Sequence, residues 1–225
     1  MPVLASQVAA DDGKRVRKLT SENGHTENRK RAVRRLSVEN NNHRSTEQSV
    51  IIRRMAFTVW TVGHSTRSID ELVGVLRAYD IELLVDVRRF PGSRRLPQFN
   101  RPALESSLTA RHIDYCWLVS LGGRRRIDAH SINVGWRNEA FRGYADYIAT
   151  EEFASGLFEL LMLARGLRTA IMCAELLWWR CHRRIISDVL TSLGASVVHI
   201  RDASDSEVHR LASPARIVDG QLVYS

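Results

Sequence analysis

From residue 57 onward, short apolar runs alternate with segments of helical period, and this alternation restricts the fold more than any other feature of the sequence. Runs rich in β-branched and aromatic side chains predict strands at residues 57–63, 81–87, 113–118, 168–174 and 196–200. Strands that alternate with helices are typical of βαβ units. We therefore predict an α/β fold with three layers, in which a mostly parallel, Rossmann-like sheet has helices on both faces.

Helix boundaries are marked by recognisable capping patterns. Ser68 and Glu71 have the spacing of a capping box, and Pro102 stands in the first turn of a second predicted helix. Helical periodicity also predicts helices at about residues 140–149, 152–165 and 181–193. Near the end of the chain, Asp219-Gly220 lies between apolar pairs, which predicts a β-hairpin over residues 217–224.

The first 54 residues differ in composition from the rest of the chain. They hold 12 of the 33 basic residues and 6 of the 25 acidic ones, so most of the net charge of +8 is located there. With few aromatic or β-branched side chains, this segment cannot bury enough apolar surface to offset its ordering entropy. We expect residues 1–54 to be a disordered basic leader that precedes one domain at 55–225. In an alternative interpretation Met55 is the physiological start.

Composition also narrows the cellular setting. No apolar run approaches the roughly 18 residues of a membrane span, and the N-terminus lacks the apolar segment of a signal peptide. Three cysteines are too few, and odd in number, for a secreted disulfide framework. We therefore expect a cytoplasmic protein without a membrane partner. The sequence indicates no particular cofactor and no particular oligomeric state.

Residues with reactive or charged side chains follow the predicted strands. Gly63-His64-Ser65 ends the first strand, Asp86-Val87-Arg88 the second, and Cys173-Ala174-Glu175 the fourth. The fifth ends in His199-Ile200. Ligands of open α/β sheets bind beyond the carboxyl ends of the strands, so we expect one shared site at this edge. Backbone N–H groups of the turn at Gly63 would favour an anion there.

These motifs occur in an order that resembles the DUF488 family. The resemblance rests on Gly63-His64-Ser65, Asp86-Val87-Arg88 with Pro91 and Ser93, Tyr115 ahead of Leu121-Gly122-Gly123, Cys173-x-Glu175, Cys181-His182-Arg183 and His199-Ile200. It covers about residues 57–201 and implies a compact α/β domain of unknown function. The sequence departs from the family pattern before Cys181, where Trp178-Trp179 replace the expected proline-containing loop.

The residue types at the strand ends suggest an enzyme that acts on a phosphorylated, nucleotide-like or nucleic-acid substrate. Guanidinium groups match phosphate oxygens, and an acid–base group or a thiol could carry out the reaction. The candidates for catalysis are His64, Asp86, Glu175 and Cys181. The candidates for binding the anion are Ser65, Arg88, Ser93, Arg94, His182 and Arg183, with Arg88 and Arg183 as the main contacts.

Other interpretations of the same residues remain open. Asp86 and Arg88 could form a structural ion pair, and Cys173 and Cys181 could be packing residues. Cys173, Cys181 and His182 are alternatively a metal site, and Trp178-Trp179 could stack on a nucleobase or divide between core and surface. The protein would then be a non-catalytic module that senses a nucleotide or nucleic acid, or a Cys/His metal-binding protein.

Overall fold

A computed structural model describes residues 57–218 and 220–225. These residues fall within one of the two units into which the chain divides. The predicted leader at residues 1–54 and the alternative start at Met55 lie outside the described residues, and so does Asp219 of the predicted hairpin turn.

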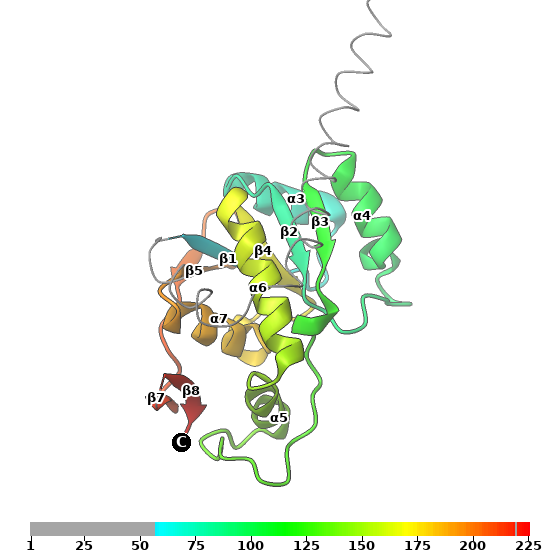
Figure 1. Cartoon of the computed structure of the whole chain (residues 1–225). Coiled ribbons are helices and arrows are strands. Elements are labelled where there is room, and N and C mark those ends of the chain that lie inside the picture. The colour runs from blue at the N-terminus through cyan, green and yellow to red at the C-terminus, as the bar shows by residue number, and fades with distance from the viewer. Residues whose placement is uncertain (1–56, 219) are drawn as a thin grey trace, which may run out of the picture. The chain divides into compact units, whose positions relative to one another are not determined.

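The described residues form a six-stranded sheet in the order β3-β2-β4-β1-β5-β6 (Figure 1). The strands are β1 (Thr58–Gly63), β2 (Leu83–Asp86), β3 (Asp114–Trp117), β4 (Thr169–Cys173), β5 (Ser196–Ile200) and β6 (Ser206–Val208). Strands β1 to β5 are all parallel to one another, and β6 runs antiparallel to β5 at one edge. The predicted α/β fold with a mostly parallel sheet is thereby confirmed.

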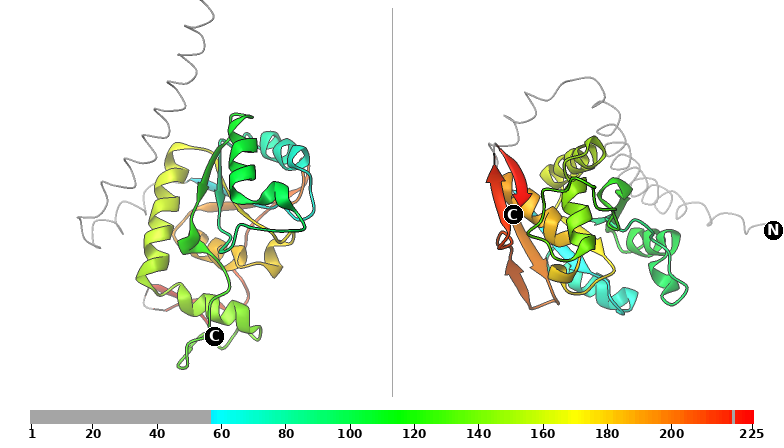
Figure 2. Two further views of the ribbon diagram at one scale, coloured as in Figure 1. Left: turned by 90° about the vertical axis from the view of Figure 1, so that its right-hand side faces the viewer. Right: turned by 90° about the horizontal axis from the view of Figure 1, so that it is seen from below.

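Helices cover both faces of this sheet. They are α3 (Ile69–Ala78), α4 (Arg101–Thr109), α5 (Glu139–Tyr147), α6 (Glu151–Gly166) and α7 (Arg183–Ser192). The crossovers through α3 and α4 move in one direction across the sheet, whereas those through α5–α6 and α7 move in the other. Right-handed crossovers then place the two groups on opposite faces, and Figure 2 shows α6 across the sheet from α3 and α4.

The change of direction makes β4 the centre of the topology. The helix that follows β4 lies on the opposite face from the helices that follow its two neighbours, β2 and β1. Chains that leave adjacent strands toward opposite faces leave a crevice between them at the carboxyl edge. A crevice is therefore expected on each side of the end of β4.

Apolar burial holds α3 and α4 against the sheet. Val62, Leu84 and Met172 of the strands pack with Leu72 of α3 and Leu104 of α4 in one buried cluster. Fully burying a side chain of this kind contributes about 1.5–3 kcal/mol, so this contact anchors the layer. None of the helices in the described ranges is both long and apolar enough to cross a membrane.

Local signals set most element boundaries. The Ser68 side chain accepts a hydrogen bond from the Glu71 backbone N–H, and the Glu71 side chain accepts one from the Ser68 N–H, so the capping box is present. Proline lies in the first turn of α4, as predicted. Strands β7 (Ala215–Val218) and β8 (Gln221–Tyr224) pair antiparallel as the predicted hairpin.

One helix boundary and one strand differ from the prediction. Helix α7 begins at Arg183 and not at Cys181, because Cys181 is extended (φ −121°, ψ 150°) after a 3₁₀ turn over Trp178–Arg180. Strand β6 was not predicted, because three residues at an exposed sheet edge carry no recognisable hydrophobic alternation.

Candidate functional site

The ends of β1, β2 and β4 lie in register along one edge of the sheet. Gly63 of β1 pairs with Cys173 of β4, and Asp86 of β2 pairs with Met172. The segments that follow these strands therefore begin beside one another. This is the edge at which the topology opens a crevice on each side of β4.

The turn after β1 is bonded tightly to the segment after β4. The His64 N–H donates to the Cys173 carbonyl (3.0 Å), and the Ser65 N–H donates to the Ala174 carbonyl (2.9 Å). A Cβ at Gly63 would lie 2.0 Å from the carbonyl oxygen of Glu175, so only glycine fits this approach. Because both N–H groups are already used, the turn does not offer them to an anion as the sequence suggested.

Two adjoining hollows form a cleft at this edge. Their volumes are about 450 Å³ and 590 Å³, within the range of small-molecule sites. Arg88, Phe90, Arg124, Glu175 and Arg180 line both hollows, so the two form one continuous cleft.

Most of the residues singled out from the sequence lie in this cleft. Its lining includes His64, Ser65, Arg88, Ser93, Cys173, Glu175, Cys181 and His182. Asp86, Arg94 and Arg183 are not part of the lining. Asp86 and Arg183 are buried beneath it, and Arg94 is exposed elsewhere on the loop after β2.

Asp86 and Arg88 form a buried ion pair. The Arg88 Nε donates to both carboxylate oxygens of Asp86 (2.9 and 3.0 Å), and Nη2 donates to Oδ2 at 2.6 Å and to the Phe99 carbonyl at 2.8 Å. The Tyr115 hydroxyl also donates to Asp86 (2.8 Å), and burial together with the Asp86 charge raises the pKa of that hydroxyl. The carboxylate is thus fully occupied by protein donors, and it positions Arg88.

His64 is a neutral base in this arrangement. Burial, followed by the charge of Arg88, lowers its pKa to about 4. Its Nδ1 lies 2.9 Å from the Ser65 carbonyl oxygen and must donate to it, which leaves Nε2 as the acceptor that faces Nη1 of Arg88 at 3.3 Å. The ring stacks on Phe99 with centroids 4.0 Å apart. His64 therefore steadies the guanidinium of Arg88.

Arg183 holds the loop between β4 and α7. Its side chain is 1% exposed and donates to the backbone carbonyls of Glu175 and Leu176, the latter at 3.3 Å. It also donates to the Cys181 sulfur (3.5 Å) and the Thr61 hydroxyl (3.4 Å). The sequence predicted that Arg88 and Arg183 would bind one anion together. In the structure, both guanidinium groups already donate hydrogen bonds to protein acceptors.

Arg124 and Arg180 have no such partners. Both are exposed, both line the two hollows, and neither side chain forms a hydrogen bond or ion pair with another described residue. The backbone of Arg124 is left-handed (φ 59°) after Gly122-Gly123. Neither residue is among the candidates predicted from the sequence. Their position directly after the Gly-Gly turn and directly before Cys181 is the signal that could have identified them.

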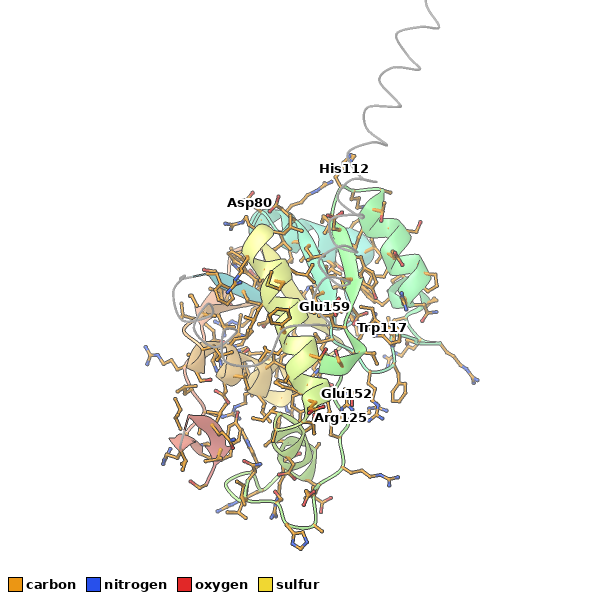
Figure 3. All side chains as sticks on the ribbon, viewed as in Figure 1. Asp80, His112, Trp117, Arg125, Glu152 and Glu159 are labelled. Carbon is orange, nitrogen blue, oxygen red and sulfur yellow. The ribbon has the colours of Figure 1, made fainter. Side chains whose placement is uncertain are left out.

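The loop that carries Arg124 is anchored by its neighbour Arg125. The Arg125 Nε donates to the Gly122 carbonyl (2.9 Å), its guanidinium lies 3.6 Å from the centroid of the Tyr147 ring, and Nη1 forms a 3.4 Å ion pair with Glu152 of α6. Figure 3 shows Arg125 and Glu152 side by side at one end of α6. These contacts fix the loop, so Arg124 is presented from a defined position.

Cys173, Cys181 and His182 form a compact group in the cleft, which we name the sulfur–histidine cluster. The His182 Nε2 lies 3.0 Å from the Val87 carbonyl oxygen and must donate to it. Its Nδ1 is then an unprotonated acceptor that faces the Cys181 sulfur at 3.5 Å and the Cys173 sulfur at 4.0 Å. Both cysteines are free thiols.

The pKa values of the two thiols of this cluster are shifted in opposite directions. The hydrogen bond to Cys181, with burial, raises the pKa of the Cys173 thiol. Burial acts in the same direction on Cys181, but the hydrogen bond from Cys173 and the positive charge of Arg183 act against it, and the pKa of the Cys181 thiol lies well below its usual value. The cluster therefore offers two thiols, of which Cys181 is the more acidic, and an imidazole lone pair. Such a set can ligate a metal or act as a nucleophile with its base.

The adjacent tryptophans lie outside the cleft lining. Trp178 stacks on His199 with centroids 3.9 Å apart, and its Nε1 donates to Glu207 (2.7 Å). Trp179 is 36% exposed. The aromatic ring that does line both hollows is Phe90, whose side chain is 65% exposed.

A comparison with protein families gives one match. The model described as "Domain of unknown function DUF488" matches residues 68–190, which is more than half of the chain. The matched segment includes the ends of β2 and β4 and the whole sulfur–histidine cluster. No curated protein and no solved structure gives a significant match.

Proposed function

The chain belongs to the DUF488 family, and we propose that it is an enzyme that acts on a phosphorylated or nucleotide-like substrate bound in the cleft. One observation carries this proposal. Arg124 and Arg180 are exposed and unpartnered by other described residues, yet both line the two hollows of the cleft. A planar guanidinium can hold two oxygens of one phosphate, so two of them suit a phosphoryl group.

Local geometry, more than net charge, supports this affinity. Residues 55–225 contain 21 basic and 19 acidic residues, so the part of the chain that carries the cleft is nearly neutral. The cleft itself is lined by Arg88, Arg89, Arg124 and Arg180, with Glu175 as the one carboxylate among its described lining residues. The positive groups are therefore concentrated where a ligand fits.

Phe90 favours a substrate that also has a planar group. Its exposed ring lines both hollows beside the arginines. Stacking of a base on an aromatic side chain contributes about 1–3 kcal/mol, which would favour a nucleotide over inorganic phosphate.

Reactive groups in the cleft support catalysis over simple binding. Glu175 is exposed in both hollows and is suited to move a proton, and the sulfur–histidine cluster lines the smaller hollow beside it. A module that only senses a nucleotide needs the arginines but does not need an acidic thiol next to an imidazole. In this proposal His64, Asp86 and Arg183 position other groups and do not react.

The test is a titration of the full chain with inorganic phosphate, AMP and ATP, monitored by calorimetry. Arg124→Gln and Arg180→Gln should each weaken binding at least about 10-fold, because each removes a charge-assisted contact of roughly 1.5–3 kcal/mol. Both variants should keep the free energy of unfolding within about 0.5 kcal/mol of the wild type.

Arg111→Gln is the matched control. Arg111 pairs with Asp70 on the surface and is not part of the cleft lining, so its replacement should leave binding unchanged. The proposal fails if the wild type binds none of the three ligands. It also fails if the double variant Arg124→Gln/Arg180→Gln binds as tightly as the wild type.

A further inference from the structure

The sulfur–histidine cluster has the dimensions of a tetrahedral metal site. The Nδ1 of His182 and the sulfurs of Cys173 and Cys181 all lie within 4.8 Å of one another. With zinc–sulfur bonds of about 2.3 Å and zinc–nitrogen bonds of about 2.0–2.1 Å, the sulfur-to-nitrogen edge of a tetrahedron is roughly 3.6 Å. The two such distances in the cluster are 3.5 and 4.0 Å. Small side-chain adjustments would complete the site.

The His182 ring is already oriented as a metal ligand. Its Nε2 donates to the Val87 carbonyl, which fixes the tautomer and directs the Nδ1 lone pair at the two sulfurs. A second hydrogen bond of this kind accompanies most metal-ligating histidines. Tyr144 packs beside the ring with centroids 5.1 Å apart, and a Cβ at Gly123 would come within 2.8 Å of Nδ1. The ring is thus confined on more than one side.

The surroundings favour deprotonated sulfurs. Arg183 donates to the Cys181 sulfur, so a positive charge lies next to that ligand. Two buried thiolates would be costly by themselves, but a divalent cation neutralises them. Two sulfurs with one imidazole select a borderline-soft metal such as zinc over magnesium or calcium.

A fourth position remains for a ligand from the cleft. Among the described residues, the group of close ligand atoms contains the two cysteines and His182 and no carboxylate. All three residues line the cleft. Zinc sites with three protein ligands and one open position are typical of catalysis, whereas structural sites have four protein ligands.

We propose that Cys173, Cys181 and His182 bind one zinc ion whose fourth coordination position opens into the cleft. The ion would bind water or a substrate oxygen as a Lewis acid. Cys181 is then a ligand and not a nucleophile. This inference stands on the cluster alone and does not require the cleft to bind phosphate.

Metal analysis of the full chain, with any affinity tag removed, tests the proposal. After loading with zinc and desalting, the wild type should retain about one zinc ion per chain. Cys173→Ser, Cys181→Ser and His182→Gln should each reduce the retained zinc by at least about 10-fold. Cys116→Ser is the matched control, because Cys116 lies on β3 outside the cluster, and it should retain zinc like the wild type.

Cobalt substitution gives a second readout that uses the wild type. Tetrahedral cobalt with thiolate ligands shows intense visible bands and a sulfur-to-cobalt charge-transfer band, and the Cys116→Ser protein should show the same spectrum. Retention of less than about 0.1 zinc per wild-type chain, or zinc retention by Cys181→Ser equal to that of the wild type, overturns the proposal. A weak, six-coordinate cobalt spectrum overturns it as well.

The phosphate titration repeated on metal-free protein separates the two proposals. If metal-free protein binds phosphate or nucleotide while the wild type retains no zinc, the zinc site is wrong and the anion site stands. If zinc is retained and no anion binds, the zinc site stands and the proposed function is wrong.

Discussion

Two groups of side chains that contain histidine lie near the β4–α7 region. Only one of them has atoms that are free to bind a ligand. The sulfur–histidine cluster leaves Nδ1 of His182 and two sulfurs facing a cleft. The other group is a buried polar chain, formed by Thr61, His199, His209 and Asp188, in which successive side chains are 2.7, 2.9 and 2.8 Å apart. Its members are buried and none lines the cleft.

The buried polar chain ends in a saturated carboxylate. Asp188 accepts from His209, from the Ala212 backbone N–H (2.9 Å) and from the Tyr224 hydroxyl (3.0 Å). Each side chain of the buried polar chain thus has a hydrogen-bond partner, as buried polar groups require. Residue type alone therefore does not distinguish a reactive site from a packing group. What distinguishes them is whether hydrogen-bonding capacity is left over and faces a cavity.

The arginines repeat this difference. Arg88 and Arg183 are buried and donate to protein acceptors, whereas Arg124 and Arg180 are exposed in the cleft without a partner among the described residues. Arg183 also joins the two histidine groups, since it donates both to Cys181 and to Thr61.

The largest expected effect comes from removing the end of the buried polar chain. Asp188→Ala leaves buried donors of His209, Ala212 and Tyr224 without an acceptor, so the free energy of unfolding should fall by about 3 kcal/mol. Urea denaturation at pH 7 measures this. Asp205→Ala, which breaks the exposed pair with Arg201, is the control and should cost less than about 1 kcal/mol. If the two variants lose equal amounts of unfolding free energy, the buried polar chain does not stabilise the fold.

Much of the fold could be predicted because its signals are local. Apolar runs, the capping box at Ser68 and the Asp219-Gly220 dipeptide each act within a few residues. Strand β6 lacked such a signal, and the start of α7 is displaced by the 3₁₀ turn over Trp178–Arg180. The convergence at one edge followed from the rule that parallel strands end together.

The internal arrangement of the site could not be predicted in the same way. The ion pair of Asp86 with Arg88 was among the possibilities that the sequence raised, but whether Arg183 is free depends on a partner far along the chain, Thr61. The tautomer of His182 depends on the Val87 carbonyl, 95 residues away. No pattern in the sequence specifies such pairs, because they are set by packing.

A second difference between the two histidine groups should appear in the pH dependence of stability. Burial, followed by the charges of His209 and Arg183, lowers the pKa of His199 from 6.5 to about 2, although Cys181 acts in the opposite direction. Between these values the unfolded chain binds a proton that the folded chain does not. Stability contributed by neutral His199 is therefore complete above pH 6.5 and is lost as the pH falls below it.

Between pH 7 and pH 5 this group alone should reduce the free energy of unfolding by about 2 kcal/mol. His64, whose pKa is also lowered, adds to the wild-type slope in the same direction. His199→Gln should therefore flatten the slope without abolishing it, as measured by denaturation at both pH values. Replacement of the exposed His130 by Gln should leave the slope as it is in the wild type. An unchanged slope in His199→Gln would contradict the assignment.

The smallest expected effect tests how firmly the ring of His182 is held. A Cβ at Gly123 would lie 2.8 Å from Nδ1 and 3.1 Å from Cγ of that ring, with Tyr144 packed nearby. Gly123→Ala should therefore lower the free energy of unfolding by about 1 kcal/mol through overpacking. It should also weaken zinc retention roughly 10-fold, because the ligand nitrogen is displaced.

Gly74→Ala is the matched control for this substitution. Gly74 is exposed within α3, and a Cβ there meets nothing within 4 Å. Alanine is favoured over glycine inside a helix, so this variant should be more stable than the wild type by about 0.5–1 kcal/mol. The two glycine variants should thus shift the denaturation midpoint in opposite directions. If Gly123→Ala is as stable as the wild type and retains zinc equally well, the ring moves freely and is not held in place for a metal.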